Sequence, residues 1–173
     1  MAAAGRSGIR VDPRGRGVAS VETGLPVLDR LLERLAHYAH FDLALEVEPG
    51  AAEEEVAEAG SALGRALTGP LRSDGAPGYG FASMTSAEAL ASVVLETSRE
   101  PLLVSNVDLT EARIGGLGTD VARRFLERFA EGAEVTLHVR LLNGTDSQHV
   151  LDAIFKALGV ALAQACRNGG DDT

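Results

Sequence analysis

The hydrophobic positions of the chain change period several times, and each change predicts an element of secondary structure. From Leu28 to Leu35 apolar residues recur every three or four positions, which indicates one face of a helix. The next stretch, FDLALEVE from Phe41, alternates apolar and polar residues as a half-buried strand does. Up to a glycine- and proline-rich turn region at 68–80, these patterns predict a strand at 18–21, a helix at 25–39, a strand at 41–48 and a helix at 51–67.

The alternation of strands and helices continues after this turn region. Two runs at 79–84 and 91–96 have the composition of strands, and 102–107 is predicted to extend the second of them. A glycine-rich loop then leads to a helix at 119–131, a strand at 134–142 and a last helix. Ser147 is the expected N-cap of that helix, whose apolar residues recur at helical spacing as far as Leu162.

A short sequence match indicates that the chain is a duplication. ALGRAL at 62–67 resembles ALGVAL at 157–162, and each lies in a helix that follows an alternating strand. Each half then reads strand, strand, helix, strand, helix, and we expect the helical faces of the two halves to pack together in an α+β fold. The predicted divisions are a flexible N-terminus at 1–8, a first half at 9–70, a second half at 71–166 and a flexible tail at 167–173.

Charge and composition exclude several classes of function. The 173 residues carry a net charge of -9, which disfavours nucleic-acid binding because such binding depends on clustered lysine and arginine. Arg123 and Arg128 alternate with glutamates and are expected to form ion pairs on a solvated helix face. No apolar run approaches the roughly 20 residues of a membrane span, and the start lacks the apolar core of a signal peptide. We therefore expect a cytoplasmic protein without a membrane partner, in which the single cysteine, Cys166, forms no internal disulfide.

The last helix carries the most chemically versatile side chains of the chain. His149 and Asp152 are three positions apart, and Lys156 follows four positions later, so all three share one helix face near its start. Such a grouping is typical of a binding or catalytic site. The polar side of an ordinary amphipathic helix has the same appearance, and the spacing alone does not separate the two interpretations.

Several longer motifs of the chain occur in the order of a known protein family. They are TGLPVLD at 23–29, FDL at 41–43, VAEAGSALGRAL at 56–67, GYG at 78–80, TLHVRLLNG at 136–144 and HVLDAIFKAL at 149–158. Through these motifs the chain resembles the imidazoleglycerol-phosphate dehydratase family from Ile9 to Cys166. The resemblance implies two fused ββαβα halves of the ribosomal S5 domain 2-like type, and a homo-oligomer of up to 24 subunits with active sites between subunits.

The resemblance also implies a reaction, the removal of water from imidazoleglycerol phosphate in histidine biosynthesis with the help of two manganese ions. One implied ion site is degraded here, because its positions hold Arg30, Glu54, Ala57 and Gln148. The other keeps nitrogen and oxygen donors that suit a single Mn, Zn or Fe ion. The alternative is that no ion binds. The four retained candidate ligands are Glu53, His138, His149 and Asp152.

The implied phosphate site departs from the family pattern as well. Gly78 stands where the resemblance implies an arginine before the YG dipeptide, and Glu100 replaces a second arginine. A glutamate repels a phosphate dianion, so this change opposes substrate binding. Lys156 and Arg99 remain as candidate substrate-binding residues, although Arg99 is one position away from the implied arginine and points to the other side of an extended chain.

Three functions remain open from the sequence. The first is a divergent dehydratase paralogue with weak or no dehydratase activity, which the degraded ion and phosphate sites favour. The second is a one-metal enzyme that acts on a different small substrate. The third is a structural or regulatory subunit that co-assembles with an active dehydratase.

Overall fold

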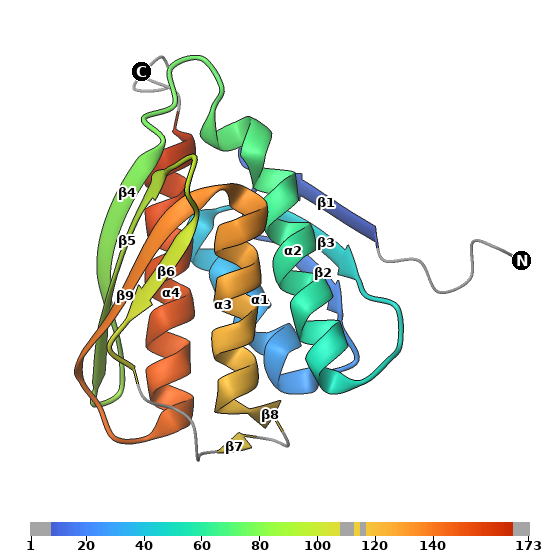
Figure 1. Cartoon of the computed structure of the whole chain (residues 1–173), viewed down its shortest axis with the longest axis vertical. Helices are drawn as coiled ribbons and strands as arrows, with labels where there is room; N and C mark the ends of the chain where they lie inside the picture. Colours follow the sequence, from blue (N-terminus) through green and yellow to red (C-terminus); the bar gives the residue numbers. More distant parts are fainter. Residues whose placement is uncertain (1–7, 108–112, 115–116, 168–173) are drawn as a thin grey trace, which may run out of the picture.

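Two β-sheets enclose a layer of four helices in the computed structural model of the chain (Figure 1). The structure describes residues 8–107, 113–114 and 117–167, so the predicted flexible ends, apart from residues 8 and 167, lie outside the described residues. The elements in chain order are β1 (Gly8–Asp12), β2 (Ala19–Glu22), α1 (Pro26–Ala39), β3 (Asp42–Glu46), α2 (Ala52–Leu71), β4 (Tyr79–Ser86), β5 (Ala89–Thr97), β6 (Leu102–Ser105), β7 (Arg113–Ile114), β8 (Leu117–Gly118), α3 (Thr119–Ala133), β9 (Val135–Asn143) and α4 (Ser147–Cys166).

The two large sheets have the same internal connectivity. In the first sheet, of order β1-β3-β2, the central strand β3 is antiparallel to β1 and parallel to β2. In the second, of order β4-β5-β9-β6, the strand β9 is antiparallel to β5 and parallel to β6. Strand β4 is an additional edge strand for which the first sheet has no counterpart among the described residues. The predicted α+β fold of two ββαβα halves is confirmed.

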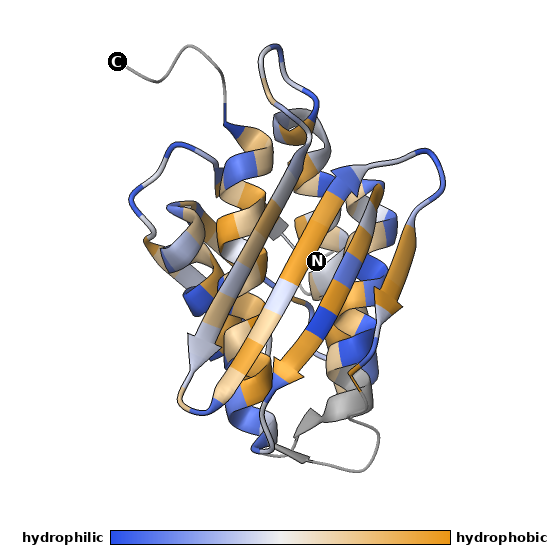
Figure 2. Cartoon of the chain, turned by 90° about the vertical axis from the view of Figure 1, so that its left-hand side faces the viewer, coloured by the Kyte–Doolittle hydropathy of each residue, from blue (hydrophilic) through white to orange (hydrophobic). Residues whose placement is uncertain are grey.

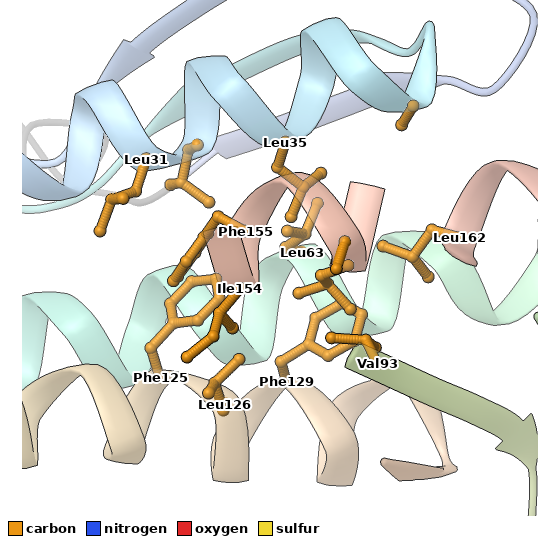
Figure 3. Packing of buried hydrophobic residues seen from close by; sticks show 14 of the residues in the cluster. Leu31, Leu35, Leu63, Val93, Phe125, Leu126, Phe129, Ile154, Phe155 and Leu162 are labelled. Carbon is orange, nitrogen blue, oxygen red and sulfur yellow. The ribbon is translucent and has the colours of Figure 1, made fainter. Parts of the chain in front are cut away.

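The helices of one half pack on those of the other, α2 against α3 and α1 against α4. Gly64 and Gly159, the matched glycines of the two similar segments, lie at these contacts. A Cβ atom on Gly64 would be 2.6 Å from the carbonyl oxygen of Phe129, and one on Gly159 would be 2.5 Å from that of Leu35. Glycine at both positions therefore lets the helix backbones approach closely. Around these contacts the core is filled by large side chains such as Leu63 (Figure 3).

Three expectations about the elements are wrong. Helix α2 continues to Leu71 instead of ending at 67, because Arg72 closes it by donating from Nη1 to the carbonyl oxygen of Ala133 (3.1 Å) and from Nη2 to that of Glu134 (2.7 Å). Residues 102–105 do not extend β5 but form the separate strand β6, which pairs with β9. Residues 8–12, for which no strand was predicted, pair with β3 as strand β1. Each outcome depends on a partner that is remote in the sequence.

Helix α4 contradicts the expectation that no apolar segment approaches the length of a membrane span. The helix is 20 residues long, and an 18-residue stretch of it has a mean hydropathy of 1.3, so it is long and apolar enough to span a membrane by length and composition alone. However, 67% of that stretch is buried inside the fold, where α4 packs against α1, β4 and β5. Its hydropathy is therefore that of a central core helix.

The basic residues of α3 form the expected ion pairs. Arg123 Nε lies 3.1 Å from Glu127 Oε1, and Arg128 Nη1 lies 3.3 Å from Glu131 Oε2, both on the exposed side of the helix. Each pair joins residues three or four positions apart, as helix geometry allows. This face carries balanced charge and does not form a basic strip.

Candidate functional site

The first turn of α4 is held by the turn between β4 and β5. The carboxylate of Glu88, in that turn, accepts hydrogen bonds from the backbone nitrogens of Asp146 (3.0 Å) and Thr145 (3.4 Å) through Oε1, and its Oε2 lies 2.7 Å from His149 Nδ1. The N-cap is Asp146, whose Oδ1 accepts from the backbone nitrogen of His149 (3.1 Å), so the expectation that Ser147 caps the helix is wrong. The cap lies one residue earlier because Ser147 already has helical geometry.

Glu88 and His149 shift each other's protonation. The hydrogen bond from the Asp146 backbone, followed by that from His149, lowers the pKa of Glu88 to about 2. The hydrogen bond to Glu88 is in turn the largest cause that raises the pKa of His149 above its ordinary value, while desolvation acts in the opposite direction. With Nδ1 committed to Glu88, Nε2 is the ring nitrogen that remains to bind a ligand.

One turn further along α4, Asp152 lies among cations and hydroxyl donors. Ser86, at the end of β4, donates to Asp152 Oδ2 (2.9 Å), and Arg34 of α1 places Nε 3.3 Å from Oδ1. Lys156 Nζ lies 3.9 Å from Oδ2, which confirms that Asp152 and Lys156 share a helix face. The same Nζ donates to the carbonyl oxygen of Thr85 (3.1 Å). Both carboxylate oxygens of Asp152 are therefore used by groups of the same chain.

The corresponding turn of α2 is built differently. Its N-cap, Ala51, provides no side-chain hydrogen bond, and the predicted ligand Glu53 is exposed beside Glu54. Glu55 turns inward instead, and its Oε1 accepts from the backbone nitrogen of Gly50 (3.0 Å). Its other oxygen, Oε2, is buried without a hydrogen-bond partner. Glu53 thus lies at a helix N-terminus, and no described contact joins it to the cluster that His149, Asp152 and Lys156 on α4 form with their partners, here called the α4 cluster.

The face of the second sheet that is turned away from the helices is toward the viewer in Figure 2. His138 is exposed on this face of β9, because its chain neighbours Leu137 and Val139 are buried in the core and strand side chains alternate. In the strand register it is opposite Val94 of β5 on one side and Val104 of β6 on the other. Together with Asn106 and Arg140 these residues line a depression of about 410 Å³. The two cross-strand neighbours of His138 are both valines, the rest of the lining includes the polar residues Ser92, Asn106 and Arg140, and no carboxylate lines the depression.

One chain does not bring the four candidate ligands together. In the part of the chain that the structure describes, no three His, Cys, Asp or Glu side chains are grouped closely enough to hold an ion. His149 and Asp152 are on α4, whereas Glu53 begins α2 and His138 lies on the outer face of β9. The donors of a single chain therefore do not fit a metal ion, and a site of these four residues remains a prediction that requires several subunits.

The candidate substrate residues are also separated. The side chain of Lys156 reaches from α4 toward β4 and is 14% exposed. Its ammonium group lies over the ring of Tyr38, 5.4 Å from the centroid. Arg99 is exposed in the loop between β5 and β6. Gly78 adopts a φ of +76°, and its nitrogen donates to the carbonyl oxygen of Ala165 (3.0 Å). No described contact joins Arg99 to Lys156.

Three residues of the α4 cluster were not found from the sequence. Glu88 and Ser86 precede their partners His149 and Asp152 by 61 and 66 positions, and Arg34 comes from the other half of the chain. No motif links such distant positions. For Arg34 the sequence offers one signal: it lies four positions before Tyr38, so both share one face of the predicted helix at 25–39.

Comparison with known proteins identifies the fold and its family together. The family model of imidazoleglycerol-phosphate dehydratase matches residues 23–162. The chain belongs to this family. It is 40% identical over 157 residues to the imidazoleglycerol-phosphate dehydratase of Syntrophobacter fumaroxidans, which covers 88% of this chain and 80% of the relative. Identity to the enzyme of the same name from Aromatoleum aromaticum is 39% over 160 residues, with 90% and 82% covered.

Solved structures agree with the dehydratase fold. Imidazoleglycerol-phosphate dehydratase from Staphylococcus aureus superposes with a TM-score of 0.86 at 24% identity and covers 94% of both chains. The protein from Pyrococcus furiosus gives a TM-score of 0.83 at 26% identity, with 94% of this chain and 90% of that chain covered. The arrangement of the two halves is therefore that of the dehydratase family over nearly the whole length.

Proposed function

We propose that this member of the dehydratase family is a divergent paralogue with weak or no dehydratase activity on imidazoleglycerol phosphate. The observation that carries the proposal is the state of Asp152, which stands at an implied ligand position. Both of its oxygens are occupied within the chain, by Arg34 and by Ser86 with Lys156 nearby. A carboxylate already neutralised by two cations is a poor ligand for a divalent ion.

Other implied ligand positions support the same proposal. Arg30 is exposed near the start of α1 and carries a positive charge where the resemblance implies a metal ligand. Ala57, in α2, offers only a methyl group. Neither can be compensated by a protonation change, because arginine stays charged and alanine has no donor atom. The two-ion chemistry implied by the family thus lacks ligands at one ion.

The phosphate positions support it further. Gly78 has no side chain to bind a phosphate, and its positive φ of +76° disfavours a larger residue at this position. Glu100 is exposed in the loop between β5 and β6, and its backbone nitrogen donates to Ser98 Oγ (3.1 Å). An exposed carboxylate at this position repels a phosphate dianion.

The test is a direct assay of the purified protein with imidazoleglycerol phosphate and excess manganese. A dehydratase from one of the similar organisms, assayed in parallel, is the positive control. We expect kcat/KM to be lower than that of the control by far more than about tenfold, which is about 1.4 kcal/mol of transition-state stabilisation. Turnover within about tenfold of the control would overturn the proposal.

We further propose that the protein forms a homo-oligomer of up to 24 subunits and that the outer face of the second sheet takes part in it. Phe81 (58% exposed), Val94 (44%) and Val104 (42%) lie in one row across the four strands, with His138 between the valines. Large exposed apolar patches of this kind commonly mark protein interfaces. Tyr79 adds a further exposed aromatic ring to the same sheet.

Light scattering after size-exclusion chromatography tests this assembly. Phe81→Asp is expected to lower the molar mass of the particle, because a buried carboxylate without a partner weakens an apolar contact. The matched control is Ala44→Asp, an exposed position on the outer face of the first sheet. A monomeric wild-type protein, or a particle that Phe81→Asp leaves unchanged, contradicts the proposed interface.

A one-metal enzyme acting on another small substrate is the second candidate, and one observation favours it. Glu88 holds His149 through Nδ1, and carboxylate partners of this kind commonly orient histidines that bind metals through Nε2. Glu53 and His138 would then have to come from neighbouring subunits. Elemental analysis of the protein after metal removal and reloading with Mn, Zn or Fe decides between one ion per chain and none.

The third candidate, a structural or regulatory subunit, follows from the same apolar face. If the outer face of the second sheet joins copies of this chain, it can also join a related dehydratase of the same fold. Mixing the protein with an active dehydratase and measuring the particles by native mass spectrometry would reveal hybrid assemblies. For all three candidates a cytoplasmic location is proposed, in keeping with the biosynthetic relatives.

A further inference from the structure

Asp152 is the centre of a unit of two ion pairs and one hydrogen bond that joins the two halves of the chain. Arg34 reaches it from α1, Ser86 from β4, and Lys156 from the next turn of α4. The distances are 3.3 Å from Arg34 Nε to Oδ1, 2.9 Å from Ser86 Oγ to Oδ2, and 3.9 Å from Lys156 Nζ to Oδ2. These three contacts provide each carboxylate oxygen with at least one partner.

Burial makes this unit stronger than a surface ion pair. The side chains of Asp152 and Lys156 are only 15% and 14% exposed, whereas that of Arg34 is 46% exposed. Lys156 is in addition fixed by the carbonyl oxygen of Thr85 and by the ring of Tyr38. Because water screens the buried members poorly, the negative charge of Asp152 is compensated mainly by Lys156 and Arg34.

A divalent cation would have to compete with Arg34 for the same oxygen. Oxygen ligands bind Zn²⁺ at about 2.0–2.2 Å, so an ion on Oδ1 would lie close to the guanidinium that is 3.3 Å from that oxygen. Two positive groups at such a separation repel each other strongly in a partly buried setting. The guanidinium cannot escape by losing its proton, because arginine remains charged.

We infer that Arg34 acts as a built-in counter-ion that excludes divalent metal ions from Asp152. The inference rests on the proposed function in one respect, since it explains why the α4 end of the implied ion site is inactive. It goes beyond the proposed function because it assigns the exclusion of metal ions to one residue, Arg34. Arg34 is a positioning residue in this role: it touches Asp152 and no reacting group, and it replaces the charge of an ion while tying α1 to α4.

Metal titration by isothermal calorimetry, with Mn²⁺ and with Zn²⁺, tests the inference without any enzymatic assay. Arg34→Gln removes the charge and keeps a polar side chain of similar length. We expect this variant to bind one of the two ions at least about tenfold more tightly than the wild type. Asp152→Asn is expected to leave the wild-type affinity unchanged, and the double variant to lose the gain of Arg34→Gln.

Two controls separate the effect of charge from a general change of the protein. Arg34→Lys keeps the positive charge, so its metal affinity should remain that of the wild type. Arg123→Gln removes an arginine from an exposed ion pair on α3 and should also leave the affinity unchanged. Circular dichroism of each variant shows whether it is folded, and the exposed position of Arg34 makes its variants suitable for this comparison.

Two results overturn the inference. One is an Arg34→Gln variant that binds both ions no more tightly than the wild type does. The other is a wild-type protein whose ion affinity falls when Asp152 becomes asparagine, since Asp152 would then already be a ligand. Neither result depends on dehydratase turnover, so a failure here is distinguishable from a failure of the proposed function.

Discussion

The first turns of α2 and α4 occupy equivalent places in the two halves, and they differ sharply in their polar contacts. In α4 the carboxylate of the N-cap Asp146 accepts a hydrogen bond from the backbone nitrogen of His149, and Glu88 and Arg34 add side-chain contacts. In α2 the N-cap Ala51 makes no side-chain capping hydrogen bond. The two turns thus share a backbone plan, while among the described contacts the α4 turn alone is joined to other elements by side-chain hydrogen bonds and ion pairs.

The interior of the two halves shows the opposite relationship. Gly64 of α2 lies against the backbone of α3, and Gly159 of α4 lies against that of α1, with nearly the same close approach. The helix contacts are therefore alike where the backbones meet, and the differences gather at the helix ends and on the outer faces of the sheets. Backbone approach permits few side chains, whereas a helix end permits many.

The outer faces of the sheets extend the comparison. On the first sheet Glu22 lies opposite Glu46 in the register between β2 and β3, and both are exposed. On the second sheet the row through His138 carries the exposed apolar side chains of Phe81 and Val94. Like charges repel across one sheet while the other presents an apolar surface, so the second sheet is the better candidate for contacts between subunits.

The largest effect is expected where the halves are alike. Gly159→Ala places a Cβ atom 2.5 Å from the carbonyl oxygen of Leu35, so α1 and α4 must move apart. We expect the free energy of unfolding, measured with urea, to fall by about 2–3 kcal/mol, and Gly64→Ala to behave similarly. Gly69→Ala is the matched control, because a Cβ atom there meets nothing within 4 Å. Equal stability of Gly159→Ala and Gly69→Ala would refute the close approach.

The next effect separates the two helix ends. Asp152→Ala leaves Lys156 and Arg34 as neighbouring cations without their shared carboxylate. We expect a loss of about 2 kcal/mol in the free energy of unfolding, discounted for the exposure of Arg34. Glu53→Ala, on the exposed turn of α2, should change it by less than about 0.5 kcal/mol. The comparison fails if the two substitutions have equal effects in chemical denaturation.

Substitutions at the two N-caps are expected to change the free energy of unfolding by smaller amounts, with opposite signs for the two helices. Asp146→Ala removes the side chain that accepts from the backbone of His149 and should lower the free energy of unfolding by about 1 kcal/mol. Ala51→Ser supplies a capping hydroxyl that α2 lacks and should raise it by about 0.5 kcal/mol. Thermal denaturation monitored by circular dichroism measures both. A loss on introducing serine at position 51 would show that the α2 turn cannot accept a cap.

The smallest expected effect is the pH dependence of stability that comes from the pair of Glu88 and His149 at the start of α4. Because Glu88 raises the pKa of His149, the stabilisation from protonated His149 is complete below the unfolded value of 6.5 and fades as the pH rises through the higher folded value. Glu88, with its pKa lowered to about 2, contributes above the unfolded value of 4.5 and loses this contribution as the pH falls toward 2. Both groups are charged between these limits, so their attraction is greatest between pH 4.5 and 6.5.

An NMR titration of the histidine ring protons measures this coupling. In the Glu88→Gln variant, the pKa of His149 should move down toward its ordinary value, because the charged acceptor is lost. The signals of the other histidines provide internal controls and should not move with the substitution. An unchanged titration of His149 in the variant would show that Glu88 does not set its protonation.

Much of the fold could be predicted from the periodicity of the sequence, because burying one face of an element requires a regular apolar pattern. The helix at 25–39 and the strand at 134–142 were predicted within a few residues of α1 and β9. The end of α2 could not be predicted, since it depends on Arg72 reaching the carbonyl oxygens that follow α3. Strand β6 likewise depends on its pairing with β9.

The candidate site shows the same division. The shared face of Asp152 and Lys156 follows from 3.6 residues per turn and could be predicted from spacing alone. The ring nitrogen that His149 commits to Glu88 could not, because the β4–β5 turn approaches α4 only in the folded chain. Whether four ligands gather around an ion is decided by the arrangement of elements, and the described residues of one chain do not gather them.

The sequence by itself determined the family, the two halves, and the residues that occupy each implied ligand position. These properties are local, since they depend on which side chain stands at which position of a recognisable motif. The tertiary structure decided what Asp152 faces. A carboxylate on a helix can bind an ion, a substrate or a neighbouring cation, and only the packing of α1 against α4 places the guanidinium of Arg34 beside it.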